Sequence, residues 1–370
     1  MYLKQLKLAN FKNYQQIDFD FSEKINCFIG NNGVGKTNVL DAIYYLSFCK
    51  SYFNSVDALN IKHNEDFFAI NGVYDISGEK SDFISCQLKR NQKKKFKKNK
   101  KEYERLADHI GIYPLVMISP YDRDLINDGS EFRRKFIDSV ISQFDKIYLD
   151  DLINYNKAVA QRNALLKQFS ERNYFDSSLI EMWDEKMIVL GENIFAKRVA
   201  FLRDFEPVFK HYFDFISDGS EIVKITYSSK LSDTDFRTLL KNNINKDRAV
   251  RYSSVGIHKD DLIFNIGDYP IKKFGSQGQQ KSFVIAIRLA QFDYTRKIKG
   301  FKPILLFDDI FDKLDDNRVG KLIKLVSENS FGQIFITDTQ KERIEHLFKE
   351  VDIDHKIYEI VDGKAKEEIA

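Results

Sequence analysis

A run of residues near the N-terminus has the types and spacing of a phosphate-binding loop. Gly30, Lys36 and Thr37 fit the pattern of a glycine, any four residues, and then glycine, lysine and serine or threonine. Glycines let such a backbone turn tightly with its N–H groups inward, the lysine reaches the terminal phosphates of a nucleotide, and the hydroxyl takes a place on Mg²⁺. The residues that we expect to bind ATP are Gly30, Asn31, Asn32, Gly33, Val34, Gly35, Lys36, Thr37 and Asn38.

The residues on either side of this loop predict the elements that hold it. Apolar residues at 25–29 predict a strand that leads into the loop, and residues 38–44 predict a helix that leads out. The N-terminus of such a helix favours an anion. Upstream, alternating apolar residues between positions 6 and 21 predict two antiparallel strands joined at a turn. Lys12 in that turn either lies beside the nucleotide or is an exposed turn lysine.

Further apolar runs predict an α/β fold. Strands are expected at 67–76, 81–88, 115–118, 222–227, 261–266, 304–307 and 333–338. The strand at 304–307 is apolar at every position, which is typical of a buried strand, and it ends in two carboxylates, Asp308 and Asp309. A helix at 319–327 joins it to the last strand.

The middle of the chain is helical in pattern. From Glu131 to about Tyr212 apolar residues recur at three- and four-residue spacing, and a further helix is expected at 236–240. Heptads are not sustained over the length that coiled-coil arms require, so we predict a compact helical lobe. The predicted domains are a discontinuous ATP-binding lobe, residues 1–120 and 251–370, and a helical lobe, residues 121–250.

A strongly basic run follows the strand that ends near residue 88. Nine of the thirteen residues from 89 to 101 are lysine or arginine, and none is acidic. Two interpretations compete: a solvated hairpin that keeps a sheet edge from pairing, and a contact with the phosphates of DNA. The candidates for DNA binding are Lys93, Lys94, Lys95, Lys97 and Lys98.

Composition restricts the class of protein. The 370 residues include 58 basic and 55 acidic side chains, so a polyanionic partner must be met by a local patch. No apolar stretch is long enough for a membrane span, and the N-terminus lacks the apolar run of a signal peptide, so we expect a cytoplasmic protein without a membrane partner. Three widely spaced cysteines agree with a reducing compartment, and we expect them to be small buried side chains.

Three more motifs, in order along the chain, resemble those of ABC ATPases. Residues 276–280 resemble the signature, Asp308 and Asp309 the Walker B pair, and residues 313–315 the D-loop. Within that class the sequence is similar to the RecF family of the SMC-like branch. The runs that carry this similarity are 10–12, 30–37, 119–120, 133–138, 161–166, 256–262, 276–281 and 289–290.

The resemblance implies an ABC-type P-loop ATPase head, with a mixed β-sheet and helices, and an inserted helical lobe. It implies that Asp308 joins Thr37 at Mg²⁺ and that Asp309 acts with Lys36 in catalysis, by orienting or deprotonating the attacking water. Asp309 alone could also be a helix N-cap. The signature residues would contact the ATP of a second copy, next to Asp315 of the D-loop: Ser276, Gln277, Gly278 and Gln279.

The function implied by the resemblance is ATP-dependent DNA binding in recombinational repair and replication-gap processing. An ATP-driven homodimer would clamp double-stranded DNA near gaps or junctions, and weak DNA-stimulated hydrolysis would release it. RecR, RecO and RecA are the partners that the family implies, in a response to DNA damage. Asp309 and Thr337 stand where many ABC proteins have glutamate and histidine, which suggests slow hydrolysis.

Two motifs of the resemblance have open roles. His258 is a possible catalytic base, but nearby Asp260 and Asp261 favour a hydrogen-bonded structural role. Arg133 and Arg134 open a helix, where they face either DNA phosphates or acidic residues of the helical lobe.

Other classes of P-loop protein remain as alternatives. One is the ATPase subunit of an ABC transporter, another is a different SMC-like ATPase of DNA metabolism, and a third is a small-molecule kinase. The helical insertion argues against a transporter subunit, and the signature motif argues against a kinase. DNA-stimulated ATP hydrolysis would distinguish the DNA-binding class from the transporter and the kinase.

Overall fold

The structure is a computed structural model of the 370-residue chain. It describes residues 1–76, 78, 80–219, 221–311, 316–327, 330–344 and 353–368. The predicted D-loop residue Asp315 lies outside the described residues.

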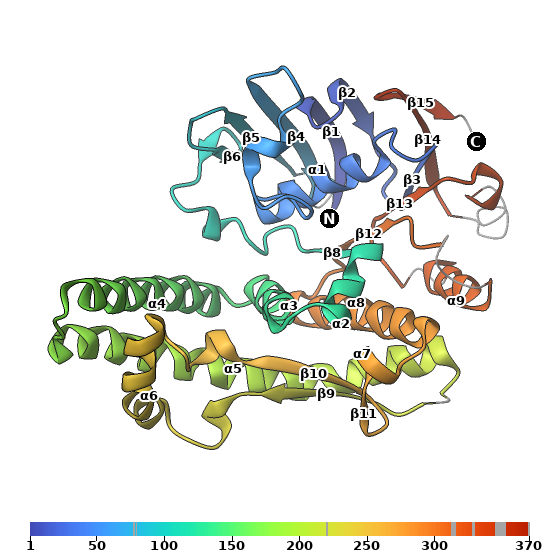
Figure 1. Ribbon diagram of the computed structural model, residues 1–370. Helices are drawn as coiled ribbons and strands as arrows, with labels where there is room; N and C mark the ends of the chain where they lie inside the picture. The colour runs from blue at the N-terminus through green and yellow to red at the C-terminus, as the bar shows by residue number, and fades with distance from the viewer. Residues whose placement is uncertain are drawn as a thin grey trace. The chain divides into compact units, whose positions relative to one another are not determined.

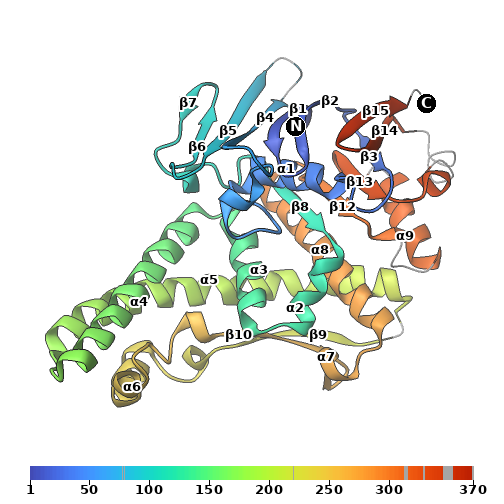
Figure 2. The same cartoon turned by 45° about the horizontal axis from the view of Figure 1, so that its top comes forward.

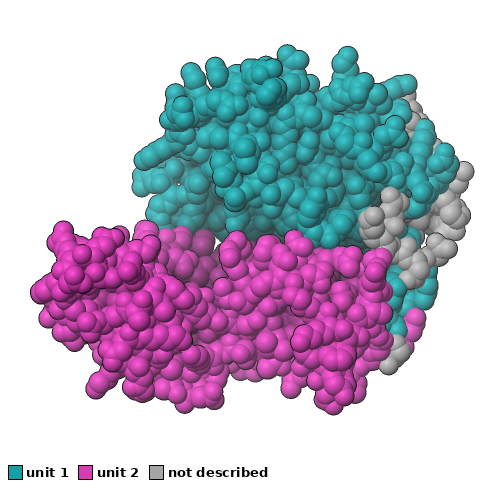
Figure 3. All heavy atoms as spheres, in the orientation of Figure 1, with its two compact units in different colours: residues 1–122, 215–217, 285–370 teal, residues 123–214, 218–284 magenta. Residues whose placement is uncertain are grey.

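The chain divides into two compact units (Figure 3). Unit 1 comprises residues 1–122, 215–217 and 285–370, and unit 2 comprises residues 123–214 and 218–284. The first boundary is close to the predicted one at residue 120. The second differs, because residues 251–284, which we expected in the ATP-binding lobe, belong to unit 2. Strand β10 (Asp261–Ile266) pairs along its length with β9 (Val223–Ser228), which keeps this part of the chain in unit 2.

One sheet of unit 1 is largely parallel and has the strand order β15-β14-β3-β13-β12-β8. Its strands are β3 (Ile25–Ile29), β8 (Leu115–Ile118), β12 (Ile304–Asp308), β13 (Ile334–Asp338), β14 (His355–Val361) and β15 (Lys364–Glu368). All pairs except β14 with β15 are parallel. The carboxyl ends of β3, β12, β13 and β8 therefore meet at one edge, where the phosphate loop begins and Asp308 ends its strand. Every residue of β3, β12 and β13 is buried, which explains their continuous apolar runs.

The second sheet of unit 1 is antiparallel, with the order β2-β1-β4-β5-β6-β7. Its strands are β1 (Tyr2–Phe11), β2 (Tyr14–Asp20), β4 (Phe67–Asp75), β5 (Ser81–Lys89), β6 (Lys95–Lys98) and β7 (Lys101–Glu102). The predicted hairpin of β1 and β2 and the predicted strands β4 and β5 are confirmed.

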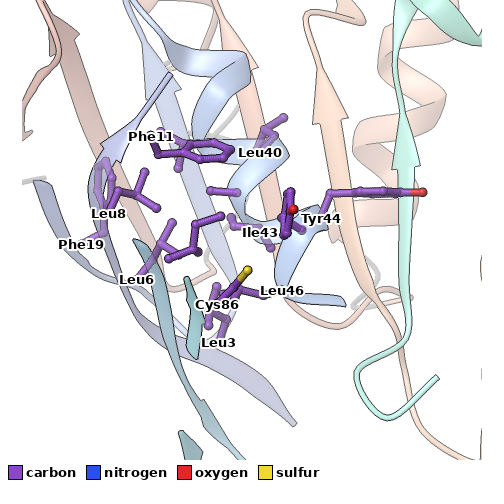
Figure 4. Close-up of a cluster of buried hydrophobic side chains, with 14 of the residues drawn as sticks. Leu3, Leu6, Leu8, Phe11, Phe19, Leu40, Ile43, Tyr44, Leu46 and Cys86 are labelled. Atoms are coloured by element: carbon purple, nitrogen blue, oxygen red, sulfur yellow. The ribbon is translucent and has the colours of Figure 1, made fainter. Parts of the chain in front are cut away.

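The main core of unit 1 lies between this sheet and helix α1 (Lys36–Phe48). Figure 4 shows Leu3, Leu6 and Leu8 of β1 on one side of the cluster and Leu40, Ile43 and Leu46 of α1 on the other, with Leu3 next to Leu46. Leu6 and Leu8 are buried at the two-residue spacing of a strand, and a register shift between Leu3 and Gln5 lets Leu3 be buried as well. The core therefore fixes helix α1, which begins with the lysine of the phosphate loop.

Unit 2 combines helices with a small antiparallel sheet of order β11-β10-β9, in which β11 is Tyr269–Pro270. Among the described residues the α-helices beyond α1 are α2 (Asp124–Asn127), α3 (Ser130–Ser142), α4 (Lys146–Arg172), α5 (Ser177–Ser217), α6 (Phe236–Val250), α7 (Ile271–Phe274), α8 (Gln277–Lys299) and α9 (Asp316–Ser327). Helix α8 begins in unit 2 and continues in unit 1, which also contains α9.

Two long helices dominate unit 2. Helices α4 and α5 lie side by side in both ribbon views (Figures 1 and 2). Arg162 of α4, whose side chain is buried, bonds to Asp184 of α5 at 2.5 Å and to Asp247 of α6 at 2.6 Å. The helical prediction for this segment is confirmed, but α5 is one helix of 41 residues that continues through Pro207.

No described helix combines the length and the apolar character needed to cross a bilayer.

Candidate functional site

The phosphate loop joins β3 to α1 and depends on its glycines. Gly35 has φ of 115°, and a Cβ added there would come within 2.3 Å of Asn13 Nδ2. Gly30 has φ of 143°, and its Cβ would come within 2.5 Å of the carbonyl oxygen of Ile360. Residues with a side chain rarely adopt these positive φ values, whereas glycine adopts them readily. The loop conformation thus requires the residue types from which the motif was recognised.

Asn13 connects the turn between β1 and β2 to the loop. Its Nδ2 donates to the carbonyl of Val34 at 2.7 Å, and its Oδ1 accepts from Asn38 Nδ2 at 2.7 Å. Tyr14 OH donates to the carbonyl of Gly35 at 2.9 Å. We predicted no role for Asn13 from the sequence. The sequence feature that could have indicated Asn13 is its place in the predicted turn of the hairpin that precedes the phosphate loop.

Lys36 is buried at the start of α1 and points back along the loop. Its Nζ donates to the carbonyl of Gly30 at 2.8 Å and to that of Asn31 at 3.0 Å. The ammonium group therefore lies within the turn of the loop, near the exposed residues Asn31, Asn32 and Gly33. This is a suitable position for a cation that meets phosphate oxygens.

Asp308 brings together the ends of several strands. Its Oδ1 accepts from Thr37 Oγ1 at 2.8 Å and from Thr337 Oγ1 at 3.0 Å, and Ser119 Oγ lies 3.4 Å from its Oδ2. Burial raises the pKa of Asp308 to about 6; the neighbouring Asp309 adds to the rise, and the hydroxyl donors oppose it. The predicted meeting of Thr37 with Asp308 is thus present in the folded chain.

Asp309 follows in a left-handed conformation, with φ of 43°. Its backbone N–H donates to Thr337 Oγ1 at 2.9 Å. Its Oδ1 is buried and has no hydrogen-bond partner among the described residues. An unsatisfied carboxylate oxygen beside a second buried carboxylate and two hydroxyls suits a hard divalent cation with bound water. These residues therefore fit Mg²⁺.

Thr337 is a site residue whose positive role the sequence did not reveal. It donates to Asp308 and accepts from the backbone of Asp309, so one hydroxyl orients both Walker B residues. From the sequence we noted Thr337 only as the residue that stands where many ABC proteins have histidine. The signal was its place at the end of an apolar strand, four positions into β13.

The signature residues form the beginning of α8 in unit 2. Ser276 Oγ accepts from the N–H of Gln279 at 3.2 Å, and Gln279 Oε1 accepts from the N–H of Ser276 at 2.5 Å, which is a capping box. Gln279 also donates to Glu221. Ser276 and Gln277 are exposed, and Gly278 and Gln279 are half-buried. Their contact with the ATP of a second copy stays a prediction.

The basic run covers the end of β5, strand β6 and the start of β7, which are neighbours at one edge of the antiparallel sheet (Figure 2). Phe96 of β6 lies opposite Cys86 and is buried, so its neighbours Lys95 and Lys97 point to the other face of the sheet. Lys94 Nζ bonds to Asp57 at 2.7 Å and to the carbonyl of Cys49 at 2.5 Å.

Lys98 is also occupied within the chain, by an ion pair with Asp82 at 2.8 Å. Lys94 and Lys98 therefore serve the fold, which corrects our equal treatment of the five lysines. Lys93 and Lys95 are exposed and Lys97 is half-buried, and these three remain candidates for DNA.

Other candidate residues from the sequence have structural partners. Lys12 pairs with the buried Asp41 at 2.6 Å and its side chain is only 12% exposed, which disfavours both alternatives, a contact with the nucleotide and an exposed turn lysine. Arg133 pairs with Asp261 at 2.7 Å, so its acidic-partner interpretation is the one supported. Cys27, Cys49 and Cys86 are buried and free, as expected.

His258 has the hydrogen-bonded structural role that we favoured. Its Nδ1 lies 2.8 Å from Tyr155 OH and its Nε2 lies 3.1 Å from the carbonyl oxygen of Ser253. Burial lowers the pKa of His258 to about 4, and burial likewise lowers the pKa of His109 in unit 1 to about 4. Both histidines are therefore neutral in the folded protein at pH 7.

The lowered pKa values of His258 and His109 predict that the protein loses stability in mild acid. Between pH 6.5 and 4 the unfolded chain binds more protons at these histidines than the folded chain, so the free energy of unfolding falls as the pH falls. Each histidine should lower the free energy of unfolding by about 2 kcal/mol between pH 7 and pH 5. Urea denaturation of the wild type and of His258→Gln at both pH values measures the effect. The variant should lose less stability, and an equal loss would contradict the assignment.

Comparison with known proteins identifies relatives of this chain. A family model, the RecF/RecN/SMC N-terminal domain, matches residues 2–360. The chain is 53% identical to the DNA replication and repair protein RecF of Flavobacterium johnsoniae, over 97% of this chain and 100% of the relative. It is 50% identical to the protein of that name from Phocaeicola vulgatus, over 99% of this chain and 98% of the relative.

Solved structures of the same family and fold are similar to this chain. The recombination mediator protein RecF with ATP, from the RecFOR pathway, has a TM-score of 0.90 and 29% identity, with 100% of this chain and 98% of that chain covered. The Smc head domain of Pyrococcus furiosus has a TM-score of 0.57 and 18% identity, over 99% of this chain and 96% of that chain, which is a likeness of fold alone. The predicted ABC-type ATPase head is thereby confirmed.

Proposed function

The chain belongs to the RecF family, within the RecF/RecN/SMC N-terminal domain proteins, and on this premise we propose that it is an ATP-dependent DNA-binding protein of recombinational DNA repair. The structural observation that supports an ATP-driven role is the junction of Thr37 with Asp308 and Thr337 at the edge of the parallel sheet. It joins the phosphate loop to the Walker B carboxylates. The family's full-length similarity disfavours the transporter and kinase alternatives.

We propose that residues 30–38 bind the phosphates of ATP and that Lys36 neutralises their charge. Thr37 and Asp308 would hold Mg²⁺, which when bound supplies charge neutralisation on the phosphate oxygens. Asp309 orients the attacking water or accepts its proton, and Thr337 holds both aspartates in place. Thr337 stands where many ABC proteins have a histidine, and a threonine cannot exchange a proton with the attacking water near pH 7. We therefore expect slow hydrolysis.

The switch that ATP controls is proposed to be a homodimer. Ser276, Gln277, Gly278 and Gln279 lie at the N-terminus of helix α8, and the dipole of a helix N-terminus suits an anion held by another molecule. The dimer would clamp double-stranded DNA in the cytoplasm, near gaps or junctions, and hydrolysis stimulated by DNA would release it. RecR is the expected protein partner, since the similar solved protein acts in the RecFOR pathway.

The outer face of the β5–β6 hairpin is the proposed contact with DNA phosphates. Replacing Lys93, Lys95 and Lys97 together by glutamine should lower affinity for all DNA sequences alike. Each lost phosphate contact should flatten the slope of log affinity against log salt by about 0.9. Affinity for a gapped duplex, measured by filter binding with and without ATP at several salt concentrations, tests this prediction.

A control with the same change of charge separates a local contact from the net charge. Lys167, Lys241 and Lys246 are exposed lysines of α4 and α6, and their replacement by glutamine should leave the salt slope close to that of the wild type. A hairpin variant with an unchanged slope would show the run to be solvated only. Equal losses in both triple variants would show a general effect of charge.

A further inference from the structure

Two large aromatic side chains are exposed next to the signature helix. Tyr269 of β11 is 60% exposed and Phe274, the last residue of α7, is 61% exposed. Their ring centroids are 4.9 Å apart, so they form one aromatic pair on the surface of unit 2. Phe274 lies two residues before Ser276, the N-cap of α8. Nothing in the proposed ATP or DNA contacts uses this pair.

The local structure holds the pair at the surface. Ile271, at the other end of α7, is buried, and its carbonyl accepts from the N–H of Gly275 at 2.9 Å. Gln280 Nε2 donates to the carbonyls of Gly275 at 3.1 Å and Ile271 at 3.3 Å. A Cβ at Gly275 would come within 2.8 Å of the carbonyl oxygen of Ile271. This close-packed turn positions Phe274 outward and just ahead of the signature.

Exposed aromatic pairs on rigid turns are characteristic of interaction surfaces. Aromatic side chains lose little conformational entropy on binding and are enriched among the residues that carry most of the energy of an interface. Lys272 and Lys273, which lie between Tyr269 and Phe274 in the sequence, are exposed and give the aromatic pair a polar rim. Only Gly275 separates Phe274 from Ser276, so the aromatic pair adjoins the start of the signature.

A second aromatic pair occurs on unit 1, at the other half of the proposed composite site, and consists of the exposed Tyr121 and the half-buried Phe53. Tyr121 is 62% exposed and its ring centroid lies 5.4 Å from that of Phe53. Tyr121 follows Ser119 by two residues, and Ser119 reaches Asp308. Each aromatic pair therefore adjoins one half of the site: the signature in one case, the Walker B carboxylate in the other.

We propose that in the ATP-bound dimer Tyr269 and Phe274 pack against the Phe53–Tyr121 pair of a second copy of this chain. The inference rests on the proposed function, in which the signature of one copy meets the ATP held by the other. That arrangement places the two aromatic pairs at the same composite site. Two-fold symmetry repeats the contact, so the dimer gains it twice.

The test uses the full chain and measures dimerisation separately from ATP binding. Phe274→Ala and Tyr269→Ala should each weaken ATP-driven dimerisation about tenfold or more, as loss of a central aromatic does, and should leave ATP binding by the monomer unchanged. Sedimentation with ATP gives the first quantity and equilibrium titration gives the second. Tyr174→Ala, which removes a tyrosine that is 59% exposed elsewhere on unit 2, is the matched control and should dimerise normally.

The partner surface is tested by a double-mutant cycle. Tyr121→Ala should weaken dimerisation as well, and adding Phe274→Ala should weaken it by less than the product of the two single effects. Independent effects would overturn the assignment of Phe53 and Tyr121 as the partner surface. Normal dimerisation of Phe274→Ala and Tyr269→Ala would overturn the aromatic contact itself. Ser276→Arg tests the proposed function separately. If this variant still dimerises with ATP, the proposed signature contact is wrong, whatever the aromatic variants do.

Discussion

Replacing Asp309 by asparagine is expected to leave ATP binding intact and to slow hydrolysis by about 10² to 10⁴-fold, the usual contribution of a general base. Asparagine has nearly the same shape, and the backbone N–H that binds Thr337 is retained. The buried Oδ1 of Asp309 would lose its charge, so the side chain could no longer accept a proton from water. The expected result is therefore an enzyme that binds ATP but is slow to use it.

Lys36→Ala is the matched variant for this experiment. It removes the ammonium group that lies on the carbonyls of Gly30 and Asn31, so ATP affinity itself should fall. Equilibrium binding and single-turnover hydrolysis, measured on both variants, separate the two steps. Hydrolysis by Asp309→Asn at the rate of the wild type would remove Asp309 from the catalytic role.

Ser276→Arg is expected to abolish ATP-driven dimerisation and DNA-stimulated hydrolysis while ATP binding by the monomer is unchanged. Ser276 caps α8 in unit 2 and does not belong to the phosphate loop, so its replacement removes nothing that holds ATP within one chain. A bulky cation at an exposed helix N-terminus obstructs a second copy at the point where its phosphates would arrive.

Mixing Ser276→Arg with Lys36→Ala makes the test decisive. Each heterodimer then contains one site in which an intact phosphate loop faces an intact signature, so part of the hydrolysis should return. Sedimentation and ATPase assays of the separate and mixed proteins measure both effects. Dimerisation of Ser276→Arg with ATP, or loss of ATP binding by its monomer, would show that the signature does not act on a second copy.

The sequence alone determined the parts of this protein that depend on short stretches of chain. The glycine positions of the phosphate loop follow from backbone conformations that only glycine adopts readily, as Gly30 and Gly35 show. The alternation of β1 and the continuous apolar runs of β3 and β12 follow from whether one or both faces of a strand are buried. These local rules predicted the phosphate loop, the strand that ends in the two carboxylates and an α/β fold, whereas the ABC-type head was implied by the resemblance.

Only the tertiary structure decided which side chains share a contact. Thr37 and Asp308 are 271 positions apart, and Thr337 joins them because β13 lies between β3 and β12 in the sheet. Lys94 and Lys95 are adjacent and chemically identical, yet one pairs with Asp57 and the other is exposed, since Phe96 sets which face of β6 is buried. A sequence pattern records residue types and spacing, whereas strand order and the direction of each side chain arise from packing between distant segments.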